Sequence, residues 1–152
     1  MKNLLTIQKI LKEFGKVLDL EALALNEGGG CRLMFDNDLE VNLELDDATD
    51  SLLLISPVAK GSEELFADAL ELNLFWGELN GCRFALLRDA NMLTMLRRIS
   101  VEGLSTVSFE AELDKFLETV MVWRLAFKRS PQQKKDTAAA CGWNMHNLSG
   151  QA

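Results

Sequence analysis

Residues 39–46, LEVNLELD, alternate strictly between apolar and polar side chains. Successive side chains of a β-strand point to opposite faces, so the alternation predicts a strand with one buried and one solvated face. Turn-forming residues flank this strand, at Asp36-Asn37-Asp38 and again over residues 46–50, and a further short apolar run lies beyond each turn. The pattern predicts three antiparallel strands joined by tight turns.

Helical patterns lie on both sides of this strand region. Between Leu4 and Leu18 the apolar residues recur with a 3.6-residue period, and four lysines and one glutamate fall between residues 2 and 16. A last helix is expected from a Ser108 N-cap to Phe127, with an apolar stripe along one side. Before it, residues 82–99 are interpreted as two strands folded about a turn at residues 89–91.

A middle helix is predicted from a Ser62 N-cap to about Leu79, stopped by Asn80-Gly81. It carries two apolar stripes on roughly opposite sides, whereas a surface helix of a monomer needs one. The stripes are Leu65, Ala69, Leu72, Phe75, Trp76 and Leu79, and Phe66, Ala67, Leu70 and Leu74. We predict that the second stripe faces a partner subunit in a homodimer; the alternative is a helix sandwiched inside its own domain.

Together these segments predict the order α-β-β-β-α-β-β-α, an α+β fold with an antiparallel sheet packed against helices. With 152 residues, we expect one domain over residues 1–129 and a mobile C-terminal tail over residues 130–152, where periodicity is lost after a proline. The net charge of −7 combines −10 for residues 1–127 with +3 for residues 128–152. This acidity disfavours nucleic-acid binding.

We expect a cytoplasmic protein. Its three cysteines are odd in number and widely spaced, which fits reduced thiols better than a disulfide framework. No apolar run in the sequence approaches the roughly 18 residues of a membrane span, and lysines interrupt the N-terminal apolar residues where a signal peptide would be continuous.

No enzyme signal rises above background. The only histidine, His146, lies in the expected tail, so a nucleophile–histidine constellation is disfavoured. The glycines at 28–30 precede a strand and lack the lysine of a phosphate-binding loop, and Cys141 with His146 falls short of the about four ligands of a zinc site. We therefore predict no catalytic residues, no cofactor and no metal.

Residues 65–124, from LFADALELNLFW to LETVMVWR, resemble the class I type III secretion chaperones, the Tir-chaperone (CesT-like) family of small acidic dimers. The resemblance lies in the order and spacing of elements over about residues 3–127 and not in a catalytic motif. It includes Phe14 and Gly15 near the end of the first helix and LLLISPVA as a strand. The tail after Arg129 has no counterpart in this pattern.

The resemblance implies a homodimeric chaperone without ATPase activity in the cytoplasm of a Gram-negative bacterium. Such a protein binds the N-terminal chaperone-binding segment of a secreted effector and keeps it extended and secretion-competent. A regulatory protein of the same fold, which sequesters a transcriptional activator or anti-activator of the secretion system, is the alternative. The residues expected to bind the effector, each of which could also pack in the core, are Leu5, Leu33, Phe35, Leu53 and Ile55. Those expected at the dimer interface are Phe66, Leu70, Leu74, Trp76, Phe84 and Leu86.

Overall fold

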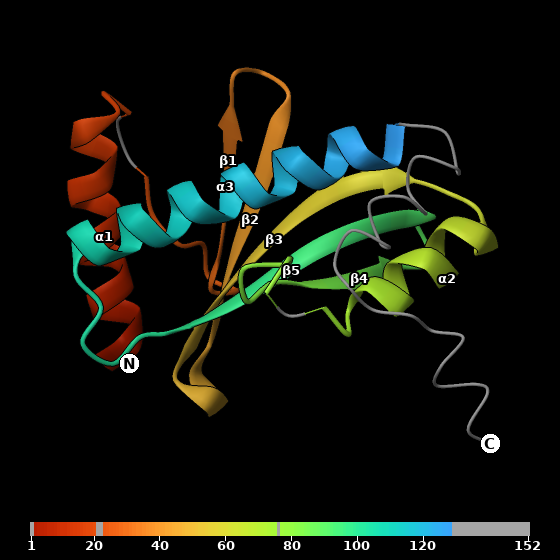
Figure 1. Cartoon of the computed structure of the whole chain (residues 1–152). Coiled ribbons are helices and arrows are strands. Elements are labelled where there is room, and N and C mark those ends of the chain that lie inside the picture. Colours follow the sequence, from red (N-terminus) through yellow and green to blue (C-terminus); the bar gives the residue numbers. More distant parts are fainter. Residues whose placement is uncertain (1, 21–22, 76, 129–152) are drawn as a thin grey trace.

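The computed structural model of the chain describes residues 2–20, 23–75 and 77–128. Within them the element order is the predicted one, and the fold is α+β (Figure 1). The expected tail at 130–152 and the candidate interface residue Trp76 lie outside the described residues. The elements are α1 (Lys2–Val17), β1 (Gly30–Phe35), β2 (Leu39–Asp46), η1 (Asp47–Thr49), β3 (Ser51–Lys60), α2 (Glu63–Leu72), β4 (Arg83–Leu87), β5 (Met92–Ser100) and α3 (Thr106–Lys128).

The five strands form one antiparallel sheet in the order β1-β2-β3-β5-β4. The alternation that predicted β2 is confirmed, since Leu39, Val41 and Leu43 are buried while the residues between them are half-buried or exposed. In the β1–β2 turn, Asp36 and Asn37 both adopt positive φ. Asp and Asn tolerate this conformation better than most residues, so the sequence favours a tight turn at this point.

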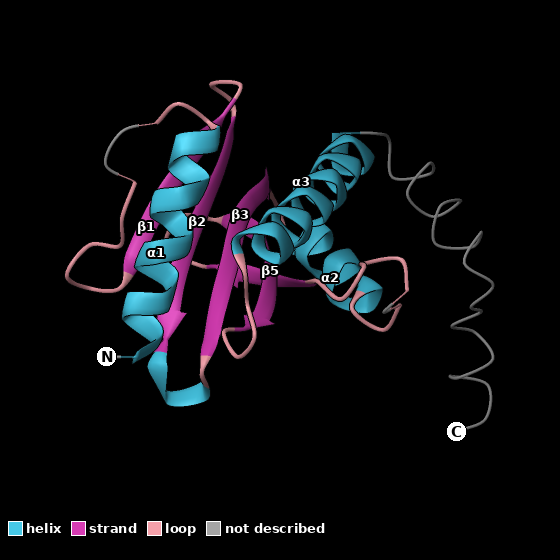
Figure 2. Ribbon diagram, turned by 90° about the vertical axis from the view of Figure 1, so that its left-hand side faces the viewer, coloured by secondary structure: helices cyan, strands magenta, loops and turns pink. Residues whose placement is uncertain are grey.

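α1 and α3 cover one face of the sheet. Figures 1 and 2 show α1 against the β1–β2 end and α3 running along β3 and β5. The two helices meet through Phe14 and Phe109, whose rings lie edge to face with centroids 5.3 Å apart. The predicted stripe of α3 is buried from Phe109 to Phe127, so this helix supplies much of the single core.

The prediction that the middle helix extends to about Leu79 is wrong, because α2 ends at Leu72. The chain then continues through turns to Cys82, with Phe75 and Leu79 still buried. Asn73 explains the early end: its side chain accepts a hydrogen bond from Phe84 N at 2.8 Å and donates one to Phe84 O at 3.1 Å. These bonds attach the end of α2 to the outer edge of β4, and a longer straight helix would carry the chain away from that edge.

Of the two serines predicted as helix N-caps, the structure confirms one. Ser62 is the N-cap of α2, and its side chain accepts from Leu65 N, as expected. Ser108, however, is not the N-cap of α3. Ser105 precedes the helix, and the two serines cap reciprocally: Ser108 N donates to Ser105 Oγ at 3.1 Å and Ser105 N donates to Ser108 Oγ at 2.9 Å.

Candidate protein-binding surfaces

The first candidate surface is apolar and lies on α2 and β4. On α2, Leu70 is 72% exposed and Phe66 is half-buried, and Leu74 in the turn after the helix is 47% exposed. Leu86 on the neighbouring strand is 41% exposed. We call Phe66, Leu70, Leu74 and Leu86 the α2–β4 patch. Phe66, Leu70 and Leu74 belong to the second stripe predicted from the sequence, and no described residue of the same chain buries Leu70 or Leu74.

Phe84 differs from the other expected interface residues because it is buried in its own chain. Its ring contacts Trp123 at a centroid distance of 5.6 Å and Phe127 at 5.5 Å, both nearly edge to face. Phe84 therefore anchors α3 to β4, which leaves its side chain little surface for a partner.

The structure does not bring the five expected effector-binding residues together. Leu5 is exposed on α1, at 67%. Leu33 is buried on the helix-covered face of the sheet, and Phe35 is half-buried against the same core. Leu53 and Ile55 are half-buried on the opposite face, since Leu52 and Leu54, their neighbours along β3, point into the core.

The two edges of the sheet differ in how they are occupied. Asn73 bonds to the outward-pointing backbone groups of Phe84 and so covers part of the β4 edge. On the β1 edge, Gly30 O accepts from Asn26 N and Gly30 N donates to the Asn26 side chain. By the alternation of an antiparallel pair, the N–H and C=O groups of Arg32 and Met34 also point away from β2. Within the described part of the chain, the outward N–H and C=O groups of Arg32 and Met34 have no partner beyond the sheet.

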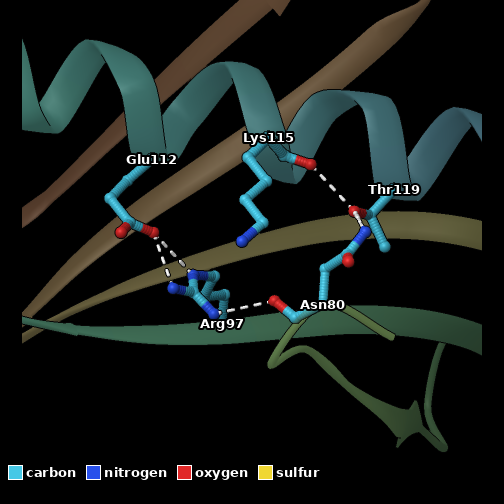
Figure 3. A network of polar contacts seen from close by, with 5 residues as sticks. All are labelled: Asn80, Arg97, Glu112, Lys115 and Thr119. Carbon is cyan, nitrogen blue, oxygen red and sulfur yellow. Dashed lines mark hydrogen bonds and ion pairs between the residues drawn. The ribbon is translucent and has the colours of Figure 1, made fainter. Parts of the chain in front are cut away.

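A polar network fixes the loop that follows α2 (Figure 3). Arg97 on β5 pairs with Glu112 on α3, with nitrogen–oxygen distances of 2.8 and 2.7 Å, and donates to Asn80 O at 2.9 Å. Asn80 in turn donates to the Thr119 hydroxyl at 3.0 Å. Sequence reasoning missed this network, because its members come from three distant segments. Each named polar group has a partner, so the network holds the loop in place.

Two kinds of reactive site, metal clusters and activated thiols, are absent from the described residues. They include no group of three or more His, Cys, Asp or Glu side chains placed to hold a metal ion. Burial raises the pKa of the Cys82 thiol to about 11 and also raises the pKa of Cys31, so both thiols stay protonated near neutral pH and are poor nucleophiles. Among the described helices none is long and apolar enough to cross a membrane.

A cavity of about 650 Å³ lies beside α1, where the segment after the helix folds against it. Sequence reasoning missed it, because it depends on how that segment packs. Its described lining residues come from α1 and from the chain after it, and they are Gln8, Lys12, Gly15, Lys16, Asp19, Leu20, Leu23 and Ala24.

Comparison with protein families matches residues 9–124 to the Tir chaperone protein (CesT) family. Among solved structures, the chain is similar to one in the ExsC-ExsE complex, with 25% identity and a TM-score of 0.73 over 80% of this chain and 92% of the other. It is also similar to one in the HopA1-SchA chaperone-effector complex, with 26% identity and a TM-score of 0.66 over 82% and 96%. A chain in the complex of the Yersinia pestis type III secretion chaperone SycH with a YscM2 fragment shares the fold, at 21% identity, a TM-score of 0.57 and coverage of 76% and 98%. No curated protein sequence matches significantly.

Proposed function

The chain belongs to the Tir chaperone protein (CesT) family, and on that premise we propose that it is a cytoplasmic type III secretion chaperone that acts as a homodimer. It binds the N-terminal chaperone-binding segment of a secreted effector and keeps that segment extended and secretion-competent. The observation that carries this proposal is the family match across nearly all of the described chain. The similar chain in a chaperone-effector complex supports it.

The open edge of β1 supports a mode of binding. An extended peptide adds to a sheet edge through main-chain hydrogen bonds, which do not depend on its sequence, and side-chain pockets then provide specificity. The outward N–H and C=O groups of Arg32 and Met34 offer such an edge. We assign Leu5 on α1 and the half-buried Phe35, Leu53 and Ile55 to contacts with the apolar side chains of the effector. Leu33 is buried, and we assign it to the core.

The α2–β4 patch supports the homodimer. A twofold interface uses the same surface of both subunits, so the exposed leucines of both subunits would be covered together. Glu71, the exposed neighbour of Leu70 in sequence, would lie in the polar rim of this interface. Because a single chain leaves Leu70 and Leu74 exposed, the sandwiched-helix alternative finds no cover for these two leucines among the described residues.

The test is co-expression of the tagged chain with the product of the adjacent gene. We expect that product to co-purify with a dimer of the chain, as measured by light scattering. In a deletion strain the effector should be degraded faster while promoter reporters of the secretion genes keep their activity. Changed reporter activity with a stable effector would favour the regulatory alternative, and a monomer that retains no neighbouring gene product would refute the chaperone proposal.

A further inference from the structure

α1 is a basic helix on an acidic body. Among residues 1–127, whose net charge is −10, this helix carries four lysines and one glutamate, so the remaining residues of that range total −13. The one glutamate, Glu13, accepts a hydrogen bond from the Thr106 hydroxyl at the start of α3. A negatively charged peptide that approaches the body is therefore repelled by most of the surface and attracted to the surface of α1.

The cavity of about 650 Å³ opens on this helix. Gly15 permits the segment after α1 to close against it: Leu20 N donates to Gly15 O at 2.7 Å, and a Cβ at position 15 would lie 2.9 Å from Leu20 O. Leu20, Leu23 and Ala24 supply apolar walls. The volume is within the usual range of small-ligand sites, and it is ample for an apolar side chain.

Two lysines line the cavity. Lys12 and Lys16 are four residues apart, so they lie one turn from each other on the same side of α1, and Gln8 continues that row. Both lysines are exposed, and neither forms an ion pair with any described residue. Among the described residues of the lining, Asp19 is the one acidic residue. The site thus combines an apolar interior with two ammonium groups available to a partner.

We propose that this cavity is a specificity site for the effector, which takes an apolar side chain flanked in sequence by Asp or Glu. The apolar side chain fills the part of the cavity lined by Leu20 and Leu23, and the flanking carboxylates pair with Lys12 and Lys16. The inference rests on the proposed chaperone function and names the chemistry of the segment recognised. Charge pairs of this kind contribute more to partner choice and association rate than to affinity.

The experiment compares two charge reversals on α1. The double variant Lys12→Glu/Lys16→Glu changes the cavity, and Lys2→Glu/Lys9→Glu makes the same change in net charge on exposed residues outside its lining. The probes are the co-purifying neighbour protein and an array of short overlapping fluorescein-labelled peptides covering its N-terminal region. Circular dichroism melting checks that both variants fold.

We expect the Lys12/Lys16 reversal to weaken peptide binding by about tenfold or more at low salt, and this loss of affinity should shrink as salt screens the charges. The Lys2/Lys9 reversal should have a much smaller effect. The peptides lost from the array should contain Asp or Glu beside an apolar residue. Leu20→Ser should weaken the same peptides at every salt concentration. Equal effects of the two reversals, or loss of peptides without acidic residues, would overturn the specificity site while leaving the chaperone function intact. Failure of the wild-type chain to retain any neighbour protein would overturn both.

Discussion

Leu70→Lys is the substitution that most directly tests the dimer. Leu70 lies in the last turn of α2 and is 72% exposed in the single chain. Lysine is a good helix former and is favourable near a helix C-terminus, so the substitution should change the stability of the monomer by no more than about 0.5 kcal/mol. Any large effect must then come from contacts outside the single chain.

The expected effect on the dimer follows from area. Full burial of a leucine side chain stabilises by about 1.5–3 kcal/mol, and most of that gain is still available at Leu70. A twofold interface contains the residue twice, so the loss is roughly 2–4 kcal/mol per dimer before the desolvation of two ammonium groups is added. At about 1.4 kcal/mol per factor of ten, the dimer dissociation constant rises at least about thirtyfold.

Size-exclusion chromatography with light scattering over a dilution series measures this shift, and thermal melting monitors folding. Leu5→Lys is the matched control, because it makes the same substitution at a leucine that is 67% exposed on another helix. Leu70→Lys should become monomeric and stay folded, while Leu5→Lys stays dimeric. A Leu70→Lys chain that keeps the wild-type dissociation constant would remove α2 from the interface, and one that unfolds as a monomer would support the sandwiched helix.

Three further predictions concern the body and the tail. Arg97→Ala should lower the free energy of unfolding by about 1–3 kcal/mol in urea titrations, because it leaves the half-buried Glu112 carboxylate and Asn80 O without their partner. The control Arg32→Ala removes an exposed ion pair and should change the free energy of unfolding by less than about 1 kcal/mol. Cys82 should resist iodoacetamide at pH 8 in the native protein and react after denaturation, because its pKa of about 11 keeps the thiol protonated at that pH. Modification of native Cys82 at the rate of a free thiol would contradict this prediction. Truncation after Arg129 should leave the melting temperature nearly unchanged, and a fall of many degrees would mean that the removed residues pack on the body.

Features that depend on local chemistry could be predicted from the sequence. The alternation of β2 predicted its buried face, and Ser62 was recognised as a cap. Residues 92–99 alone could also be helical, and the turn before Met92 favoured the strand that the structure shows. The β4–β5 turn has an added support that sequence does not reveal: Asn91 adopts positive φ and its side chain donates to Gly61 O at 2.8 Å.

Features that depend on contacts between distant segments could not be predicted. The end of α2 is decided by the Asn73 side chain, which finds its partner on Phe84, eleven residues later. Asparagine within an apolar run carries no signal that it will bond to a strand. The insertion of β5 between β3 and β4 and the cavity beside α1 likewise follow from long-range packing. For this reason the candidate effector residues, which were chosen by their apolar character, separate onto different faces of the molecule.

The sheet order connects the two proposed surfaces. β1 and β4 are the outer strands of a five-stranded sheet, so about 19 Å of sheet separates the open β1 edge from the α2–β4 patch. A dimer formed through that patch leaves both β1 edges free, at opposite ends of the assembly. The two β1 edges are then at least about 38 Å apart, and because an extended chain advances about 3.3 Å per residue, at least about a dozen residues are needed to connect them. One effector segment longer than that could occupy both edges. Two weak edge contacts joined in this way bind far more tightly than either alone. The dimer would then be needed for affinity even though its interface touches no effector residue, and Leu70→Lys should weaken effector binding without altering the β1 edge.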